Sequence, residues 1–276
     1  MINVATLGPK GTFSGLAVKK YLELTATDGK TIYYPTIGKV FNGINTECSL
    51  GIIPIENSLD GYVQQTLDLL SQNDFTIISE IVVPVQFCFL GNGKNLKDIN
   101  KIYVQFKSKG QCYNFIEKFN DDVKIIITES NTESFNEVSK MKDGEGAIVP
   151  VHLLDNRFKL IVNNVTDSEF NETRFIVLSK NSNNLNGTEK YKTSIAIMNA
   201  VDTKPGVLSK ILNEFAKKDI NLTSIISRPT KKALGQYYFF IDIEGDLNKD
   251  NKIKEVINEI SKENIIKILG SYPIIG

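Results

Sequence analysis

The strongest constraint on the fold is the alternation of β-rich runs with helical patterns over the first 180 residues. Ile2–Leu7 predicts a buried strand, and from Phe13 onward apolar side chains recur at helical spacing. Such alternation gives an open α/β sheet with helices on its faces. Further strands are expected at residues 50–55, 102–104, 123–128, 146–150 and 174–178.

Three further segments of this region predict helices. Val63, Leu67 and Leu70 recur at helical spacing directly after the strand at 50–55. The apolar residues at 112, 115, 116 and 119 predict a helix with one buried face. Ser130-Asn-Thr-Glu133 predicts a capping box that opens another helix.

The polar segment 181–192 interrupts this organisation, because it crowds Asn and Gly together without an apolar period and therefore indicates a linker. A second unit, 193–276, follows. Strands are expected at 193–199, 221–227, 237–243 and 265–269, and helices around 208–215 and 253–260. The order βαββαβ is the ferredoxin-like pattern.

Charge and composition exclude several classes of function. The 32 basic and 32 acidic residues cancel, and no basic run stands out, which argues against nucleic acid as a partner. The odd number of well-separated cysteines favours neither a disulfide framework nor a structural zinc site. A single histidine, His152, makes a His-based metal site improbable. The N-terminus lacks a signal peptide pattern and the longest apolar run, 81–90, is too short to cross a membrane, so a cytoplasmic location is expected.

Gly8-Pro-Lys-Gly-Thr-Phe-Ser14 is the first segment that offers chemistry, since glycines between a strand and a helix bring backbone N–H groups close to an anion. Thr12 and Ser14 add hydroxyl donors. By itself the pattern favours an ordinary capped turn, and it matches neither a dinucleotide fingerprint nor a P-loop.

Two more segments carry polar residues at strand ends. Glu56, Asn57 and Ser58 follow a buried strand, where open α/β sheets bind ligands, although a helix-capping turn explains them equally well. Arg174 opens a strand that is otherwise apolar, and its planar guanidinium suits a carboxylate. An edge arginine paired with a nearby acid is the simpler interpretation of that residue alone.

Together these segments resemble the prephenate dehydratases, in order and spacing, over residues 2–272. The resemblance rests on Gly8-Pro-x-Gly-Thr-Phe-Ser14, on Pro54-Ile-Glu-Asn-Ser58 and on Thr173-Arg-Phe175. The C-terminal unit is similar to an ACT domain through Pro205-Gly-Val-Leu208 and Ser227-Arg-Pro229. The chain departs from the family at 104–108, at 131–133, at Tyr62, where a small residue is usual, and at Ile226, where the sensing motif has Glu.

The resemblance implies a cofactor-free and metal-free enzyme that removes carbon dioxide and water from prephenate to make phenylpyruvate in phenylalanine biosynthesis. Thr173 would donate to the leaving hydroxyl, and Arg174 would hold the pyruvyl carboxylate. Phe175, Glu56, Asn57 and Ser58 would complete the catalytic group. Substrate-binding residues would be Thr12, Ser14, Asn131 and Thr132.

The resemblance also implies a two-lobed, periplasmic-binding-protein-like catalytic domain over 1–180, with Thr173 near the hinge. Lobe 1 would comprise about 2–78 and 159–180, and lobe 2 about 79–158. L-Phenylalanine would bind between two ACT domains and inhibit the enzyme, which requires a homodimer or homotetramer. Its contacts would be Gly206, Val207, Leu208, Asn221, Leu222 and Ser227.

Two alternatives remain open on the sequence. An arogenate dehydratase performs the same elimination on the transaminated substrate and must hold the same ring. A phenylalanine-binding regulatory protein without activity is suggested by the departures at 104–108 and opposed by the intact Thr173-Arg-Phe175. A plain solute-binding protein is less favoured, because no export signal is present.

Overall fold

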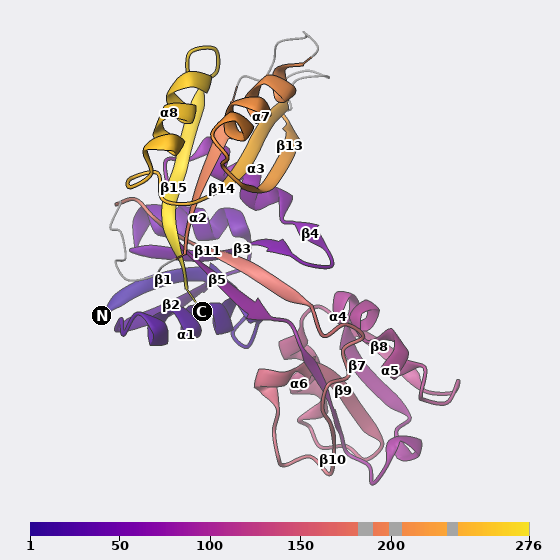
Figure 1. Ribbon diagram of the computed structural model, residues 1–276. Helices are drawn as coiled ribbons and strands as arrows, with labels where there is room; N and C mark the ends of the chain where they lie inside the picture. Colours follow the sequence, from indigo (N-terminus) through magenta and orange to yellow (C-terminus); the bar gives the residue numbers. More distant parts are fainter. Residues whose placement is uncertain (182–189, 199–205, 231–236, 276) are drawn as a thin grey trace.

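A computed structural model describes residues 1–181, 190–198, 206–230 and 237–275. The chain forms three parts: two α/β lobes joined by long strands, and a C-terminal domain that packs on the first lobe (Figure 1). The expected α/β fold with a C-terminal ferredoxin-like domain is therefore confirmed.

Lobe 1 is a mixed sheet in the order β5-β11-β3-β1-β2, with the short β4 paired to β3. β1 pairs in parallel with β2 and β3, whereas β11 runs antiparallel between β3 and β5. Its strands are β1 (Ile2–Leu7), β2 (Gly29–Tyr34), β3 (Leu50–Asn57), β4 (Gly61–Tyr62), β5 (Thr76–Pro84) and β11 (Glu172–Ser179). Its helices are α1 (Phe13–Leu24), α2 (Ile37–Thr46) and α3 (Gln64–Gln72).

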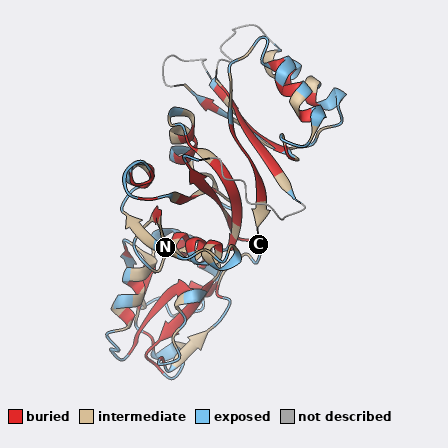
Figure 2. Ribbon diagram, turned by 90° about the vertical axis from the view of Figure 1, so that its left-hand side faces the viewer, coloured by how far each residue is buried: buried red, intermediate tan, exposed pale blue. Residues whose placement is uncertain are grey.

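The two faces of this sheet have different cores. Val4, Ile52, Phe175 and Val177 pack with α1 on one face. On the other face a larger cluster joins Ile53 and its neighbours from α2 and α3 with buried residues of the C-terminal domain. The alternation follows from the strand repeat of two, which sends successive side chains to opposite faces. Figure 2 shows that buried residues are concentrated in these strands.

Lobe 2 is a second sheet in the order β10-β6-β9-β7-β8. Its strands are β6 (Phe87–Gly91), β7 (Lys101–Gln105), β8 (Lys124–Thr128), β9 (Glu145–Pro150) and β10 (Leu160–Val162). The α-helices are α4 (Phe106–Gln111), α5 (Tyr113–Ile116) and α6 (Asn131–Val138), and 3₁₀ turns span Leu96–Asp98 and Val151–Leu153.

The lobe boundaries differ from those expected. β5 continues the lobe 1 sheet to Pro84, and β10 belongs to lobe 2 through its pairing with β6. The chain therefore crosses between the lobes at about 84–87 and again at about 166–171, later than the expected 78 and 159 in both cases. The apolar run 81–90 hides the first crossing, because it spans the end of one strand and the start of another.

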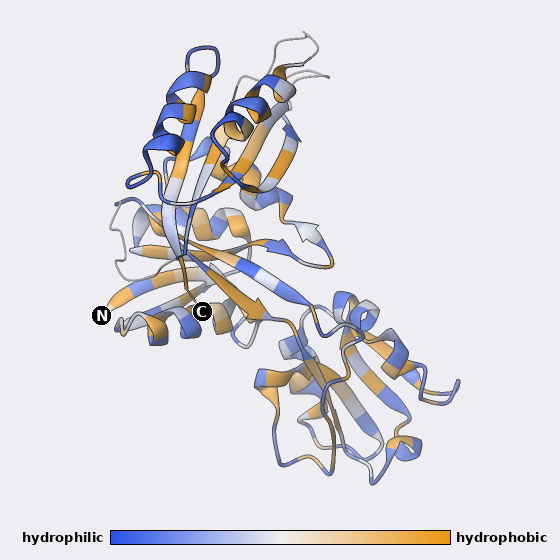
Figure 3. Ribbon diagram, in the orientation of Figure 1, coloured by the Kyte–Doolittle hydropathy of each residue, from blue (hydrophilic) through white to orange (hydrophobic). Residues whose placement is uncertain are grey.

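The C-terminal domain has strands β12 (Tyr191–Ile197), β13 (Leu222–Pro229), β14 (Tyr237–Glu244) and β15 (Ile266–Ile275) and helices α7 (Val207–Lys217) and α8 (Asn251–Ile260). The expected order βαββαβ is confirmed, with the sheet order β13-β14-β12-β15. Ile195, Ile241 and Ile257 belong to the core between the helices and the sheet. Figure 3 shows the largely hydrophilic outer side of α8.

β15 joins the C-terminal domain to lobe 1 in one continuous sheet. It is longer than the strand expected at 265–269, and its end pairs in parallel with β5 through Ile274↔Glu80 and Ile275↔Ile81. Gly270 allows this approach: it has φ +155°, and a Cβ there would lie 2.2 Å from the carbonyl oxygen of Ile77. The C-terminal domain is thus fixed directly to the strand beside β11.

Two helix expectations need correction. The segment expected as one helix over 112–119 is α-helical only in α5, and Cys112, at φ −130°, separates α5 from α4. The capping box at Ser130 is half confirmed. Its hydroxyl accepts from the N–H of Glu133, but the Glu133 carboxylate accepts from Glu129. Outside the described residues lie positions 182–189 of the linker expected at 181–192, and also Asn199, Pro205 and the turn around Gly235. Tyr191 and Lys192, the last residues of the expected linker, belong to β12.

Of the helices in the described segments, none is both long and apolar enough to cross a membrane.

Candidate active site

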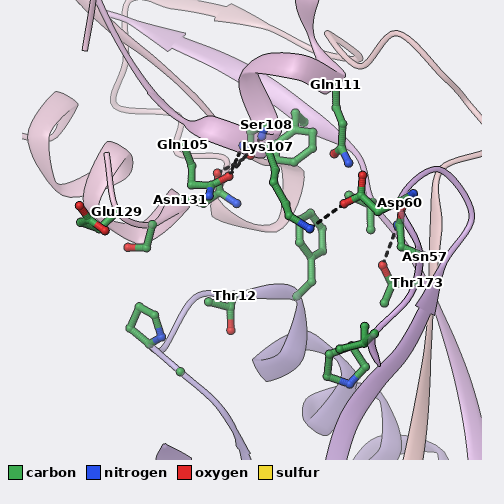
Figure 4. A pocket seen from close by; sticks show the side chains of 18 of the residues that line it. Thr12, Asn57, Asp60, Gln105, Lys107, Ser108, Gln111, Glu129, Asn131 and Thr173 are labelled. Atoms are coloured by element: carbon green, nitrogen blue, oxygen red, sulfur yellow. Dashed lines mark hydrogen bonds and ion pairs between the residues drawn. The ribbon is translucent and has the colours of Figure 1, made fainter. Parts of the chain in front are cut away.

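A cavity of about 450 Å³ lies between the two lobes. Lobe 1 contributes the turn after β1, the hairpin around β4 and the start of β11, while lobe 2 contributes the first residues of α4 and α6 (Figure 4). Its polar wall comprises Thr12, Asn57, Asp60, Gln105, Lys107, Ser108, Gln111, Glu129, Ser130, Asn131 and Thr173. Its apolar wall includes Phe13, Pro54, Tyr62, Val63, Val85 and Phe87.

Thr173 lines this cavity from the first residues of β11 and is held there by Asn57. The Asn57 amide donates to the Thr173 hydroxyl oxygen at 3.0 Å and also to the side chain of Asn171 at 2.8 Å. The Asn57 oxygen in turn accepts from the backbone N–H groups of Leu59 and Asp60, which fixes the amide. Because Asn57 is the donor, Thr173 uses a lone pair in this bond and can give its own hydrogen to a ligand.

The structure does not bring Glu56, Ser58, Arg174 or Phe175 to the cavity, which corrects four of the expected catalytic positions. Arg174 and Glu56 face one another across β11 and β3, on the side opposite to Thr173 and Asn57. Ser58 bonds to the backbone of Phe170 and Glu172 and holds the second crossing between the lobes. Phe175 is buried in the core under α1. The two-residue repeat of a strand accounts for Glu56 and Arg174. Phe175 shares the face of Thr173 but lies deeper, under α1, and Ser58 follows the end of β3.

The expected substrate-binding residues divide in the same way. Thr12 and Asn131 line the cavity at the beginnings of α1 and α6. Ser14 is buried inside the first turn of α1. Thr132 instead donates from its hydroxyl to the carbonyl of Lys10 at 2.7 Å, so it joins lobe 2 to the turn after β1 rather than facing the cavity.

Sequence reasoning missed the lobe 2 wall formed by Gln105, Lys107, Ser108 and Gln111. Lys107 is the one Lys or Arg among the described lining residues, and its ammonium lies 2.9 Å from the carboxylate of Asp60 in lobe 1. Gln105 ends β7 and the other three lie in α4 directly after it, so the rule that ligands bind at the carboxyl ends of strands could have found them. The departure of 104–108 from the family pattern concealed them.

Other contacts join the lobes beside the cavity. The Nε2 atom of His152 lies 3.0 Å from the carbonyl oxygen of Gly11, and its ring meets Phe13 edge to face at 5.4 Å. Phe13 also packs edge to face on Phe87 of lobe 2. Desolvation lowers the pKa of His152, although the Gly11 bond acts in the opposite direction. His152 is therefore a neutral bridge between the lobes at pH 7.

Known proteins match this chain along nearly its whole length. The prephenate dehydratase family model matches residues 4–183, and the ACT domain model matches residues 195–262. The chain belongs to the prephenate dehydratase family. A prephenate dehydratase of Methanocaldococcus jannaschii is 37% identical over 270 residues, which cover 96% of each chain. The chain is accordingly an enzyme of this class, with an ACT domain at its C-terminal end.

Solved prephenate dehydratases share the whole architecture. The structure from Arthrobacter aurescens, determined in complex with L-Phe, has a TM-score of 0.84 and 27% identity, covering 99% of this chain and 90% of its own. The structure from Staphylococcus aureus has a TM-score of 0.82 and 28% identity, covering 98% of this chain and all of its own. The two-lobed catalytic fold is thus shown by structure as well as by sequence.

On the far face of β11, Arg174 belongs to a buried charge cluster between the dehydratase part and the ACT domain. Its Nη2 lies 2.9 Å from Asp242 of β14, and its Nε lies 3.3 Å from Glu56 and 3.7 Å from Glu80. Lys192 of β12 bonds to both oxygens of Glu80, at 2.8 and 2.9 Å. Burial lowers the pKa of Arg174, but Asp242 and Glu80 outweigh it and raise that pKa above its usual value. Arg174 therefore stays charged.

The expected effector residues of the ACT domain lie at the beginning of α7 and along β13. Gly206 precedes α7 with a left-handed φ of +96°, and Val207 and Leu208 form the first turn. Asn221 precedes β13 and its amide bonds to Glu244 at 2.8 Å. Leu222 and Ser227 lie on β13, the strand at the edge of the described sheet. Ile226, at the departure from the sensing motif, packs against the cluster shared with lobe 1.

Proposed function

We propose that the chain converts prephenate to phenylpyruvate, on the way to L-phenylalanine, and that L-phenylalanine inhibits it through the ACT domain. The observation that carries the catalytic proposal is the Thr173 hydroxyl, which lines the interlobe cavity and is oriented by Asn57 with its hydrogen available to a ligand.

The reaction sets three requirements for the cavity. The ring carboxylate leaves as carbon dioxide, the electrons of its bond enter the ring, and the hydroxyl opposite departs with a proton as water. The site must therefore assist the leaving hydroxyl, hold the pyruvyl carboxylate, and leave the departing carboxylate weakly bound. Strong pairing of that last group would stabilise the substrate more than the transition state.

Thr173 meets the first requirement. Its hydroxyl donates to the leaving oxygen, polarises the carbon–oxygen bond and relays the proton that completes the water molecule. A free threonine is a very weak acid, so orientation by Asn57 matters more than acidity. Positioned acid–base assistance of this kind is worth about 10² to 10⁴ in rate.

Lys107 replaces Arg174 as the anchor for the pyruvyl carboxylate. Its ammonium faces the cavity beside Ser108, and the N-terminal ends of α1 and α6 add partial positive charge at Thr12 and Asn131. The ring would rest on Phe13, Val85 and Phe87, which offer no strong charge to the departing carboxylate. Lys107 is mostly solvent-exposed in the absence of ligand, so binding can redirect it from Asp60.

Regulation is proposed from the ACT domain and from the relative that was solved with L-Phe. L-Phenylalanine would bind at Gly206, Val207, Leu208, Asn221, Leu222 and Ser227, between two copies of the domain in a homodimer or homotetramer. The edge strand β13 supports such pairing, since it is unpaired on one side within the described sheet. Inhibition requires that the effector prefer one global state, typically by about 1–3 kcal/mol.

Arogenate is the second candidate substrate, favoured by one observation. The carboxylates of Asp60 and Glu129 line the cavity and suit the ammonium that arogenate carries in place of the ketone. Product formation from each substrate should be measured with and without millimolar L-phenylalanine. Turnover of prephenate suppressed by L-phenylalanine supports the proposal. Preference for arogenate moves the assignment to that substrate, and inactivity on both favours a regulatory protein.

A further inference from the structure

We propose that Tyr62 is a positioning residue of the active site whose place is set by the ACT domain through Ser224. The inference rests on the proposed function and deepens it, because it names the contact by which β13 reaches the substrate cavity.

The position of Tyr62 joins two environments. Tyr62 lines the cavity between Gly61 and Val63, while its side chain lies on the face of Glu56 and packs against the hydrophobic cluster that lobe 1 shares with the ACT domain. Its hydroxyl lies 2.7 Å from the Ser224 hydroxyl on β13, a separation that only a hydrogen bond gives. A side chain of the regulatory domain therefore touches a residue of the cavity wall directly.

The hairpin that carries Tyr62 also touches the other lobe. β4 pairs with the end of β3 through Glu56↔Tyr62 and Asn57↔Gly61. Asp60 at its tip pairs with Lys107 across the cavity. The same Asn57 side chain that holds this turn also orients Thr173. A shift of Tyr62 would accordingly move Asp60, which pairs with Lys107, and Asn57, which orients Thr173.

β13 is well placed to move Tyr62. Ser224, Ile226 and Arg228 alternate on the side that faces lobe 1, where Ser224 meets Tyr62, Ile226 enters the shared cluster, and Arg228 pairs with Asp68 of α3 at 2.8 Å. Leu222, an expected effector contact, packs with the core under the helices on the opposite side. The expected effector contact Leu222 and the Tyr62 contact Ser224 thus lie on opposite faces of one strand.

The test compares two interdomain hydroxyl groups. Tyr62→Phe and Ser224→Ala each remove one end of the Tyr62–Ser224 bond. Tyr238→Phe is the matched control, because the Tyr238 hydroxyl also crosses the interface, to Asp68 at 2.7 Å, but Tyr238 does not line the cavity in the described structure. Hydrogen–deuterium exchange of the peptide 58–63 and the KM for prephenate are measured for each variant and for Tyr62→Phe/Ser224→Ala together.

Loss of a hydrogen bond should speed exchange of the hairpin about two- to tenfold in Ser224→Ala, although the substitution lies in another domain. Tyr62→Phe and Ser224→Ala should raise KM by the same factor, change kcat less, and weaken inhibition by L-phenylalanine. The double variant should add nothing. Tyr238→Phe should leave hairpin exchange and KM unchanged.

Two results would overturn the inference. If Ser224→Ala left the exchange of peptide 58–63 and the KM for prephenate at their wild-type values, Ser224 would not position Tyr62, even if Tyr62→Phe had an effect. If Tyr238→Phe changed exchange and KM equally, the effect of the Tyr62–Ser224 bond would come from the stability of the whole interface. Failure of the wild-type protein to turn over prephenate would instead contradict the proposed function, while the exchange comparison would still decide whether Ser224 positions the hairpin.

Discussion

The two faces of β11 differ in what they contact, although their residues alternate along one strand. Thr173 faces the cavity, is held by one neutral amide, and adjoins the crossing between the lobes. Arg174, the next residue, faces the ACT domain and lies within reach of three carboxylates. One dipeptide of the strand therefore has one side chain at the cavity and one at the ACT domain. We call the first side the chemical face, after the role proposed for Thr173, and the second the docking face.

The two side chains therefore need opposite electrostatic surroundings. A hydroxyl that assists a leaving group needs a precise place and little charge around it. A buried guanidinium needs charge around it, because burying an unpaired ion costs several kcal/mol. The same backbone carries both, so the Arg174–Asp242 pair and the Asn57–Thr173 bond hold one short stretch of β11 from its two faces.

The largest effect is expected on the chemical face. Thr173→Val keeps the volume and the β-branch but removes the donor, so kcat should fall by about 10² to 10⁴. The fold should persist, because the Thr173 hydroxyl bonds only to a side chain at the cavity edge in the described structure. Steady-state kinetics with prephenate, together with a thermal unfolding curve, would measure both quantities.

Thr173→Ser serves as the control for this prediction. It keeps the hydroxyl and should retain far more activity than Thr173→Val. A wild-type kcat in Thr173→Val would exclude Thr173 from the mechanism, and the two faces of β11 would then not differ in catalysis.

On the docking face the expected loss is in stability. Arg174→Met removes the guanidinium beside Glu56, Glu80 and Asp242. Lys192, which pairs with Glu80, remains, and removal of one partner from a buried pair costs about 3–5 kcal/mol. Urea unfolding would show this loss. kcat of the folded protein should change much less than in Thr173→Val.

Arg157→Met is the matched control for Arg174. Arg157 also forms an ion pair with a carboxylate, Asp155 at 2.6 Å, but it lies on the surface. Its removal should produce little change in the unfolding curve. If Arg174→Met instead abolished activity at unchanged stability, Arg174 would act on the substrate as first expected from the sequence.

Much of the fold could be predicted because periodicity reports on burial. The βαββαβ order of the C-terminal domain follows from apolar spacing alone, and so do α1 and β3. β2 was missed because its residues alternate weakly, and the first lobe crossing because its apolar run spans two elements. α2 was missed although Ile37, Val40 and Ile44 recur at helical spacing. The final residues of β15 contain Gly270 and Pro273, a composition typical of a turn, and pairing with β12 as far as Pro273 and with β5 at the last two residues makes them a strand.

The candidate site was predicted in part for a related reason. Motif order located Thr12, Asn57, Asn131 and Thr173, which line the cavity. The motif did not separate neighbours on opposite faces, although the strand repeat of two would have placed Thr173 and Arg174 apart. Which face meets the cavity depends on where the ACT domain packs, and that long-range contact has no local signal in the sequence.

A third prediction concerns binding on the chemical face. Lys107→Met removes the cation proposed for the pyruvyl carboxylate, and a hydrogen bond to a charged group is worth about 1.5–3 kcal/mol, or roughly 10- to 150-fold in KM. Lys109→Met, two residues further along α4, is the control, because Lys109 does not line the cavity in the described structure. Equal KM values for both variants would exclude Lys107 as the carboxylate anchor.

The smallest expected effect is on the pH dependence of the free energy of unfolding, and it again differs between the two faces. The pKa of Arg174 is raised, so the docking face keeps its charge throughout the physiological range, whereas His152 lies on the cavity side with a lowered pKa. An unfolded histidine titrates near pH 6.5, so below that value the unfolded chain binds a proton that native His152 resists. The free energy of unfolding should therefore decline as pH falls from about 6.5 towards the native pKa of His152.

The single histidine allows a direct measurement of this pKa. Its ring signals in an NMR titration should give a value below that of the same residue in urea, and His152→Gln should remove this part of the pH dependence of stability. The glutamine amide can still donate to the carbonyl of Gly11, so the substitution changes the titration more than the contact between the lobes. A native pKa at or above the urea value would show that the ring is solvated, and that the cavity side lacks the desolvated contact between His152 and Phe13.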